Sequence, residues 1–216
     1  MSDAPVISVR GEAVLEAEPE IARVTVHVQA RERERRDALD RLAERNEQCL
    51  ALVRSYGDAV ERVETGGLSV TPEIRYGKRN DVAAYRGTAV LKLTVADFTV
   101  LAELLPRLAD QERTSVHGPD WALREDSEVH ARAAREAALR AVERARGYAD
   151  ALGTRLTGLV SLSDESTQDP GYGFAPMAAA ARGGADGEPE PIVVEPQVQT
   201  VRAAVLARFT ATPPEL

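Results

Sequence analysis

Three histidines, His27, His117 and His130, are the side chains of this sequence that are best suited to chemistry. Imidazole acts as a general acid or base near neutral pH and binds transition metals. Zinc motifs on helices place two histidines four residues apart, and these three lack that spacing. His27 falls on the polar face of an alternating segment and His130 opens a helix, so both are interpreted as solvated. His117 lies near a turn with Asp120, but two residues do not make a site, and we predict no metal site.

The single cysteine, Cys49, rules out an internal disulfide and a metal site built from several cysteines. A redox-active thiol needs an exposed position next to positive charge, and Arg45 lies one helical turn away. Cys49 nevertheless falls on the apolar side of a helical pattern, beside Leu50 and Val53. We interpret it as a small buried hydrophobic residue.

Other motifs that carry chemistry are missing from the sequence, including the nucleophile elbow of hydrolases and the phosphate-binding loop. Adjacent carboxylates such as Glu125–Asp126 and Asp164–Glu165 stand at the ends of predicted elements, where acidic residues cap helices or are solvated. The sequence therefore predicts no catalytic, cofactor-binding or metal-ligating residue, and we predict that the protein is not an enzyme.

A segment at about 164–191 is rich in Gly, Pro and Ala and shows no periodicity, so it is interpreted as a flexible surface loop. It contains four large apolar or ring side chains, Tyr172, Phe174, Pro176 and Met177. Such side chains dock onto a partner or a neighbouring subunit, or they fold back on their own sheet. Both interpretations stay open, and these four residues are a candidate partner-contact loop.

The remaining chain has clear periodicity. Apolar residues recur at every second position in strands and at steps of three and four in helices. Strands are predicted at about 6–17, 22–31, 60–74, 83–96, 114–124, 156–163 and 197–210. Helices are predicted at about 32–56, from Asp97 to Pro106, and at 127–152, where nine of the positions 131–151 are alanine. The first two strands, joined at Glu18-Pro19-Glu20, are predicted to form a long hairpin.

The resulting order is β-β-α-β-β-α-β-α-β-β. It predicts an α+β fold in which helices lie on one face of a mostly antiparallel sheet, within a single domain that spans 1–216. Two weakly similar β-α-β-β units are visible in this order. The first takes in 22–31, 32–56, 60–74 and 83–96, and the second takes in 114–124, 127–152, 156–163 and 197–210.

Charge and composition narrow the classes of function. The formal net charge is −8, which argues against nonspecific binding to nucleic acid or to an anionic membrane. No run of 18 apolar residues is present, so no membrane span is predicted. The amino terminus lacks a positive start followed by an apolar stretch, which predicts a cytoplasmic protein. The alternative is an exported protein whose true amino terminus is missing.

Several stretches, taken in order, resemble the SIMPL-domain family, which includes bacterial 26 and 28 kDa periplasmic immunogenic proteins. They are Ile7–Ala13, Ala22–Val28, Val63–Pro72, Tyr85–Ala89, the Ala-rich helix with Leu152-Gly153, and Pro191-Ile192 before the last strand. The resemblance covers nearly the whole chain. It implies self-association, with ring-like or channel-like assemblies in some members, and a link to oxidative stress. It implies no catalytic residues.

Two functions follow as expectations. The first is a non-enzymatic, self-associating protein, an oligomeric scaffold or interaction protein linked to stress response as the resemblance implies. Its physical reason is strand length, because long strands leave long edges that must be covered, charged or paired. The alternative is a small-molecule binding module, with a groove between the sheet and the Ala-rich helix that Trp121 or Tyr148 lines.

Overall fold

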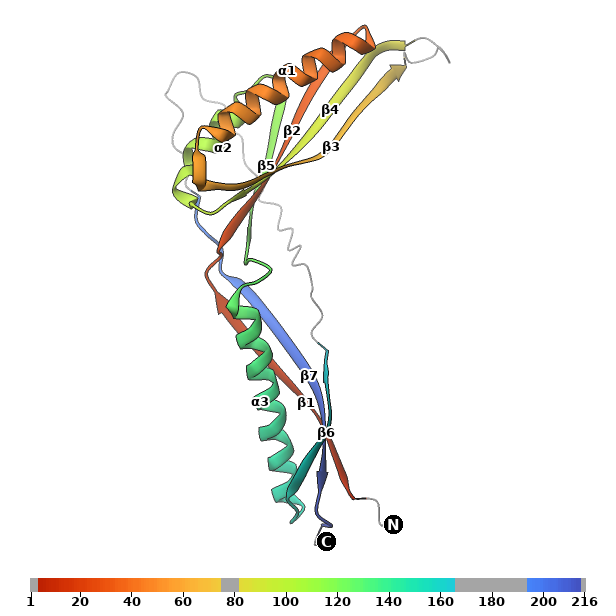
Figure 1. Ribbon diagram of the computed structural model, residues 1–216, viewed down its shortest axis with the longest axis vertical. Helices are drawn as coiled ribbons and strands as arrows, with labels where there is room; N and C mark the ends of the chain where they lie inside the picture. Colours follow the sequence, from red (N-terminus) through yellow and green to blue (C-terminus); the bar gives the residue numbers. More distant parts are fainter. Residues whose placement is uncertain (1–3, 75–81, 166–193, 215–216) are drawn as a thin grey trace, which may run out of the picture. The chain divides into compact units, whose positions relative to one another are not determined.

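The computed structural model describes residues 4–74, 82–165 and 194–214. Its elements follow the predicted order (Figure 1). They are β1 (Val6–Ala17), β2 (Ile21–Glu32), α1 (Arg35–Arg54), β3 (Val60–Ile74), β4 (Val82–Val95), α2 (Leu101–Ala109), β5 (Thr114–Ala122), α3 (Glu128–Ala151), β6 (Leu156–Asp164) and β7 (Gln199–Ala211), with short 3-10 turns at Gly57–Ala59 and Phe98–Val100. Within these residues no helix is long and apolar enough to cross a bilayer.

The elements form two compact units. The four-stranded unit holds the sheet β3-β4-β2-β5 with α1 and α2, and the three-stranded unit holds the sheet β1-β7-β6 with α3. All strand pairs are antiparallel. The α+β class with antiparallel strands is thus confirmed. The strands, expected in one sheet of one domain, are divided between two sheets, each with its own core.

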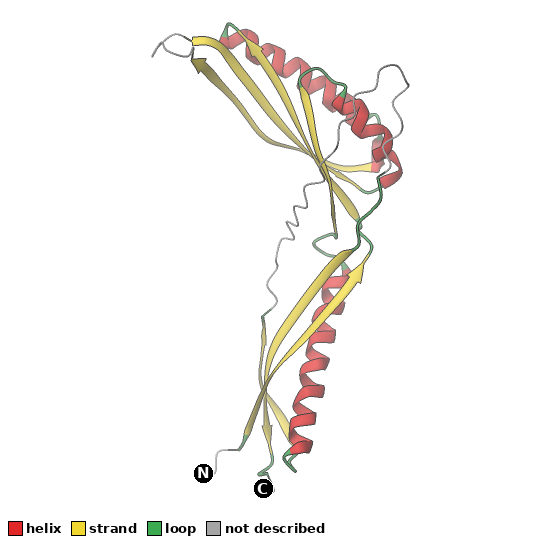
Figure 2. Cartoon of the chain, turned by 180° about the vertical axis from the view of Figure 1, so that it is seen from behind, coloured by secondary structure: helices red, strands yellow, loops and turns green. Residues whose placement is uncertain are grey.

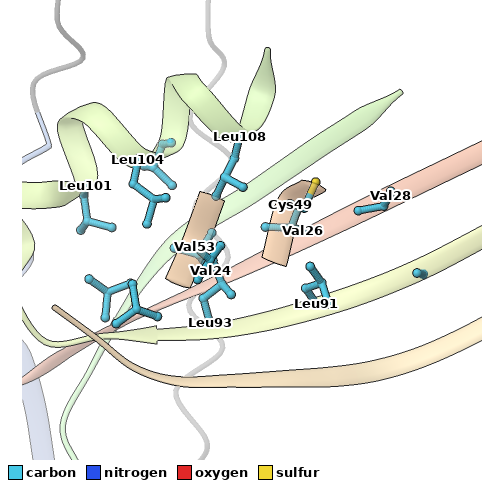
Figure 3. Close-up of a cluster of buried hydrophobic side chains, with 14 of the residues drawn as sticks. Val24, Val26, Val28, Cys49, Val53, Leu91, Leu93, Leu101, Leu104 and Leu108 are labelled. Atoms are coloured by element: carbon cyan, nitrogen blue, oxygen red, sulfur yellow. The ribbon is translucent and has the colours of Figure 1, made fainter. Parts of the chain in front are cut away.

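The core of the four-stranded unit follows from strand alternation. Val24, Val26 and Val28 of β2 are fully buried on one face, with Leu91 and Leu93 of β4 beside them. The helices close this core with branched side chains, as Figure 3 shows. Those that α1 and α2 contribute include Leu42, Val53, Leu101, Leu104 and Leu108. Burial of each such side chain contributes about 1.5–3 kcal/mol.

Helix α2 differs from prediction at Pro106, where the helix was expected to kink or end. It continues to Ala109. Its buried face, formed by Leu101, Leu104, Leu105 and Leu108, extends past the proline. We attribute the continuation to this packing, which opposes the loss of one backbone hydrogen bond at proline.

The core of the three-stranded unit is built from small side chains. Helix α3 begins at Ser127, whose Oγ accepts a hydrogen bond from the Val129 backbone N–H (3.4 Å), and it lies along one face of β1 and β7 (Figures 1 and 2). Its buried stripe consists of alanines 133, 137, 141, 145 and 149. A Cβ added to Gly11 of β1 would lie 2.1 Å from the Ala137 carbonyl oxygen, so only glycine fits there.

The predicted hairpin of β1 and β2 is wrong. Strand β1 pairs with β7, and β2 pairs with β4 and β5. Side-chain size explains the separation: the Gly11 and Ala13 face of β1 matches an alanine helix, whereas the valines of β2 match the leucines of α1.

The first predicted β-α-β-β unit is confirmed, but the second has a different first strand. Strand β5 joins the edge of the four-stranded sheet, and β1 takes its place in the unit that contains α3, β6 and β7. With that exchange the two units share one topology, because the sheet orders β2-β4-β3 and β1-β7-β6 correspond strand for strand. The similarity lies between segments that are far apart in the chain, which a search for consecutive repeats misses.

Candidate interaction surface

Two of the three histidines meet in the structure. The rings of His27 on β2 and His117 on β5 pack edge to face, with their centroids 5.1 Å apart. They lie on the sheet face opposite α1, since their neighbours Val26 and Val28 point into the core. His130 is exposed on α3, as predicted. Nowhere in the described chain do three His, Cys, Asp or Glu side chains come close enough to hold a metal ion.

Cys49 is fully buried, as predicted. Its Sγ atom lies 3.9 Å from Thr114 Oγ1. Burial raises the pKa of this thiol, and the hydrogen bond to Thr114 opposes that shift. A raised pKa lowers the thiolate fraction, so the geometry favours a packing role over a reactive one.

Arg45, considered as an activating charge for Cys49, is occupied elsewhere. Its Nη1 atom donates to the Gln29 carbonyl (2.9 Å) and its Nη2 atom pairs with Glu112. The side chain is 10% exposed, whereas that of Glu112 is 73% exposed. The hydrogen bond to Gln29 links α1 to β2, and the ion pair with Glu112 links α1 to the turn before β5. It was missed in the sequence because residues 45 and 112 come together only when α1 and β5 pack onto the same sheet.

The two side chains expected to line a ligand groove, Trp121 and Tyr148, belong to different units of the structure. Trp121 packs against Phe98, with ring centroids 4.8 Å apart, at the margin of the four-stranded core. Tyr148 lies in the other unit, on α3, and is exposed. The close approach at Gly11 leaves no space between β1 and α3 there. A hollow of about 660 Å³ lies along β1 and α3, and residues of both elements line it, including Arg10, Leu15, Glu136 and Arg140.

The candidate partner-contact loop, Tyr172, Phe174, Pro176 and Met177, lies outside the described residues. So does most of the predicted flexible segment at about 164–191. Among the described residues, the candidate surface for contact with a partner lies on β6 of the three-stranded unit.

Helix α3 covers β1 and β7 but makes few contacts with β6. On β6, Leu159 and Leu162 stand opposite Phe209 and Ala207 of β7. Opposed residues in an antiparallel pair share a face, and Phe209 and Ala207 are buried under α3. The two leucines therefore point to the helix side, yet they are 59% and 52% exposed because α3 does not reach them.

This surface is not predictable from the sequence pattern, because β6 has the apolar residues of a covered strand. Alternating or apolar sequence indicates which face of a strand is suited to burial. It does not indicate how many strands one helix covers. Residues 156–163 contain no charged residue and no proline, and that local composition is the signal that could have identified an unusual strand.

A family model described as SIMPL, protein of unknown function (DUF541), matches residues 7–209 of the chain. The match runs through both compact units, from β1 to β7. A search of curated proteins found no match.

Proposed function

The chain belongs to the SIMPL family, and from this premise we propose that it is a non-enzymatic, self-associating protein whose sheet surfaces hold copies together. The observation that carries this proposal is the uncovered helix-side face of β6. Leu159 and Leu162 are exposed to solvent, although the residues beside them on the same face of β7 are buried. Contiguous apolar surface is a feature of interaction sites, and this face of β6 extends the apolar face of β7.

Strand length supports the proposal. Strands β1, β2, β3, β4 and β7 have 12, 12, 15, 14 and 13 residues, compared with the usual five or six. Of these, β3 and β1 are outer strands, and each presents a long row of backbone N–H and C=O groups that pairing with another chain would satisfy.

The charged side chains support a structural rather than a chemical role. Glu73 of β3 accepts from Arg31 Nε of β2 (2.7 Å) and pairs with Arg86 of β4, so that one carboxylate links three strands. Hydrogen bonding by Arg31, followed by that of Arg86, lowers the pKa of Glu73. Glu112 likewise accepts a hydrogen bond from Arg45. These carboxylates are held ionised as acceptors, the opposite of what a proton donor needs.

Sedimentation equilibrium of the full chain at micromolar concentration tests the proposal. We expect a mass that is a multiple of the 23.3 kDa chain and that falls on dilution. A mass of one chain at every concentration used would show that the protein does not self-associate.

A further inference from the structure

Each of the two sheets has two outer strands. They are β3 and β5 in the four-stranded sheet, and β1 and β6 in the three-stranded sheet. Outer strands of soluble proteins carry charges, prolines or bulges that hinder pairing with another chain. The four outer strands differ in this protection, and the difference identifies the one suited to pairing.

Three of the outer strands carry such protection. Strand β3 contains Glu61, Arg62, Glu64, Pro72 and Glu73, together with three shifts of register against β4. Strand β5 contains Pro119 and Asp120. On β1, Arg144 of α3 donates to the Arg10 carbonyl (2.8 Å), so a side chain of the same unit already occupies this outer backbone group.

Strand β6 has less protection. Its first eight residues, 156–163, are Leu, Thr, Gly, Leu, Val, Ser, Leu and Ser, with neither charge nor proline, and its one charged residue is the last, Asp164. All of them except Leu156 are exposed. The feature of β6 that hinders pairing with another chain is a pair of register shifts against β7. Within the described residues its second side has no strand beside it.

The ends of β6 carry opposite charges. Arg155 precedes the strand, and Asp164 and Glu165 close it. An antiparallel pair of two such strands places the start of one beside the end of the other. Arg155 of each copy then lies next to the acidic end of the other copy, which makes the strand electrostatically complementary to itself.

We infer that β6 is the surface through which a second copy of this chain binds, pairing antiparallel with its own β6 around a two-fold axis. This inference rests on the proposed self-association and specifies where it occurs. The two three-stranded sheets become one six-stranded sheet. Because a two-fold axis that relates antiparallel neighbours is perpendicular to the sheet, Leu159 and Leu162 of both copies lie on the same face and pack together across the junction.

Charge reversal tests the pairing without altering the core. The variants are Arg155→Glu and Glu165→Arg, both at exposed positions. Arg155→Glu places a negative charge beside the acidic end of the other copy, and Glu165→Arg places a positive charge beside Arg155 of the other copy. Each variant alone is expected to weaken the dimer about tenfold or more, since two-fold symmetry applies each change twice. An equimolar mixture of the two variants restores opposite charges at both ends, so we expect heterodimers. Glu165 also forms an ion pair with Arg10 of its own chain, with Nε and Oε2 3.8 Å apart. The melting temperature of each variant therefore serves as a check that it is folded.

Leucine substitution provides an independent test. Leu159→Lys and Leu162→Lys put a charge at the centre of the junction, and we expect a monomer with an unchanged melting temperature. The matched control is Leu68→Lys on the protected outer strand β3, where the leucine is 62% exposed. It is expected to leave assembly intact.

The outcomes separate the two proposals. If wild type and all variants sediment as the same oligomer, self-association stands and the β6 surface is wrong. The same holds if Leu68→Lys disrupts assembly and the β6 variants do not. If wild type is a monomer, the proposed function itself fails.

Discussion

At the scale of single residues, Gly11 has the clearest physical requirement. The place where its Cβ would stand is 2.1 Å from the Ala137 carbonyl oxygen and 2.5 Å from the Ala141 backbone nitrogen. These are backbone atoms, so a side chain there displaces the helix itself. Gly87 on β4 also faces a helix, but its added Cβ would meet the end of the Leu42 side chain at 3.1 Å, which can move. The alanine stripe of α3 therefore depends on one glycine more strictly than the leucine face of α1 does.

Gly11→Ala is expected to lower the free energy of unfolding of the three-stranded unit by about 3 kcal/mol or more, because overpacking against backbone cannot relax by rotamer changes. Chemical denaturation followed by circular dichroism measures it. The matched control is Gly147→Ala on the same unit, where an added Cβ has no neighbour within 4 Å. Removing a glycine from a helix interior should raise stability by roughly 0.5–1 kcal/mol. A Gly11→Ala variant as stable as wild type would disprove the close packing of α3.

At the scale of elements, the Arg45–Glu112 pair joins α1 to the turn before β5. The hydrogen bond from Arg45, then its charge, lowers the pKa of Glu112. A carboxylate with a lowered folded-state pKa contributes stability that is present above its unfolded pKa, about 4.3. That contribution is lost as pH falls through the lower, folded-state value.

Glu112→Gln should therefore lower the melting temperature at pH 6–7. The difference from wild type should shrink as the pH falls below about 4. Thermal melts across pH 3–7 measure both. Glu47→Gln on α1 is the control, since Glu47 pairs with Arg54 at the surface (3.2 Å, side chains 66% and 64% exposed), and exposed pairs contribute little. A difference between Glu112→Gln and wild type that stays constant down to pH 3 would contradict the role given to the ionised carboxylate.

At the scale of the whole molecule, the two units have separate cores. The single tryptophan, Trp121, packs at the core of the four-stranded unit. Its fluorescence thus reports on that unit alone, whereas circular dichroism near 222 nm reports on α1, α2 and α3 together.

We expect Gly11→Ala to separate these two signals. Part of the helical signal should be lost at lower denaturant concentration than the change in Trp121 fluorescence, because the damage lies in the three-stranded unit. The two transitions of the wild-type protein, measured by fluorescence and by circular dichroism, are the reference. A single transition that moves both signals together in the variant would show that the units unfold as one cooperative structure.

The type and order of the elements were predictable because each depends on neighbours in the chain. Alternation of Val24, Val26 and Val28 indicates a half-buried strand, and the alanines of 131–151 indicate a helix. Burial of Cys49 followed in the same way, from its place on an apolar helical stripe.

Which strands and helices pack against each other was not predictable from local periodicity. An amphipathic strand is compatible with any complementary surface, so β1 was placed in a hairpin with β2 although it fits the alanine face of α3. The contacts His27–His117 and Arg45–Glu112 join residues far apart in the chain, and they exist only once β5 has joined the edge of the four-stranded sheet. Exposure of Leu159 and Leu162 arises because α3 spans two strands and not three. Local periodicity thus determined the elements and their buried faces, whereas long-range packing alone decided which faces met and which stayed in water.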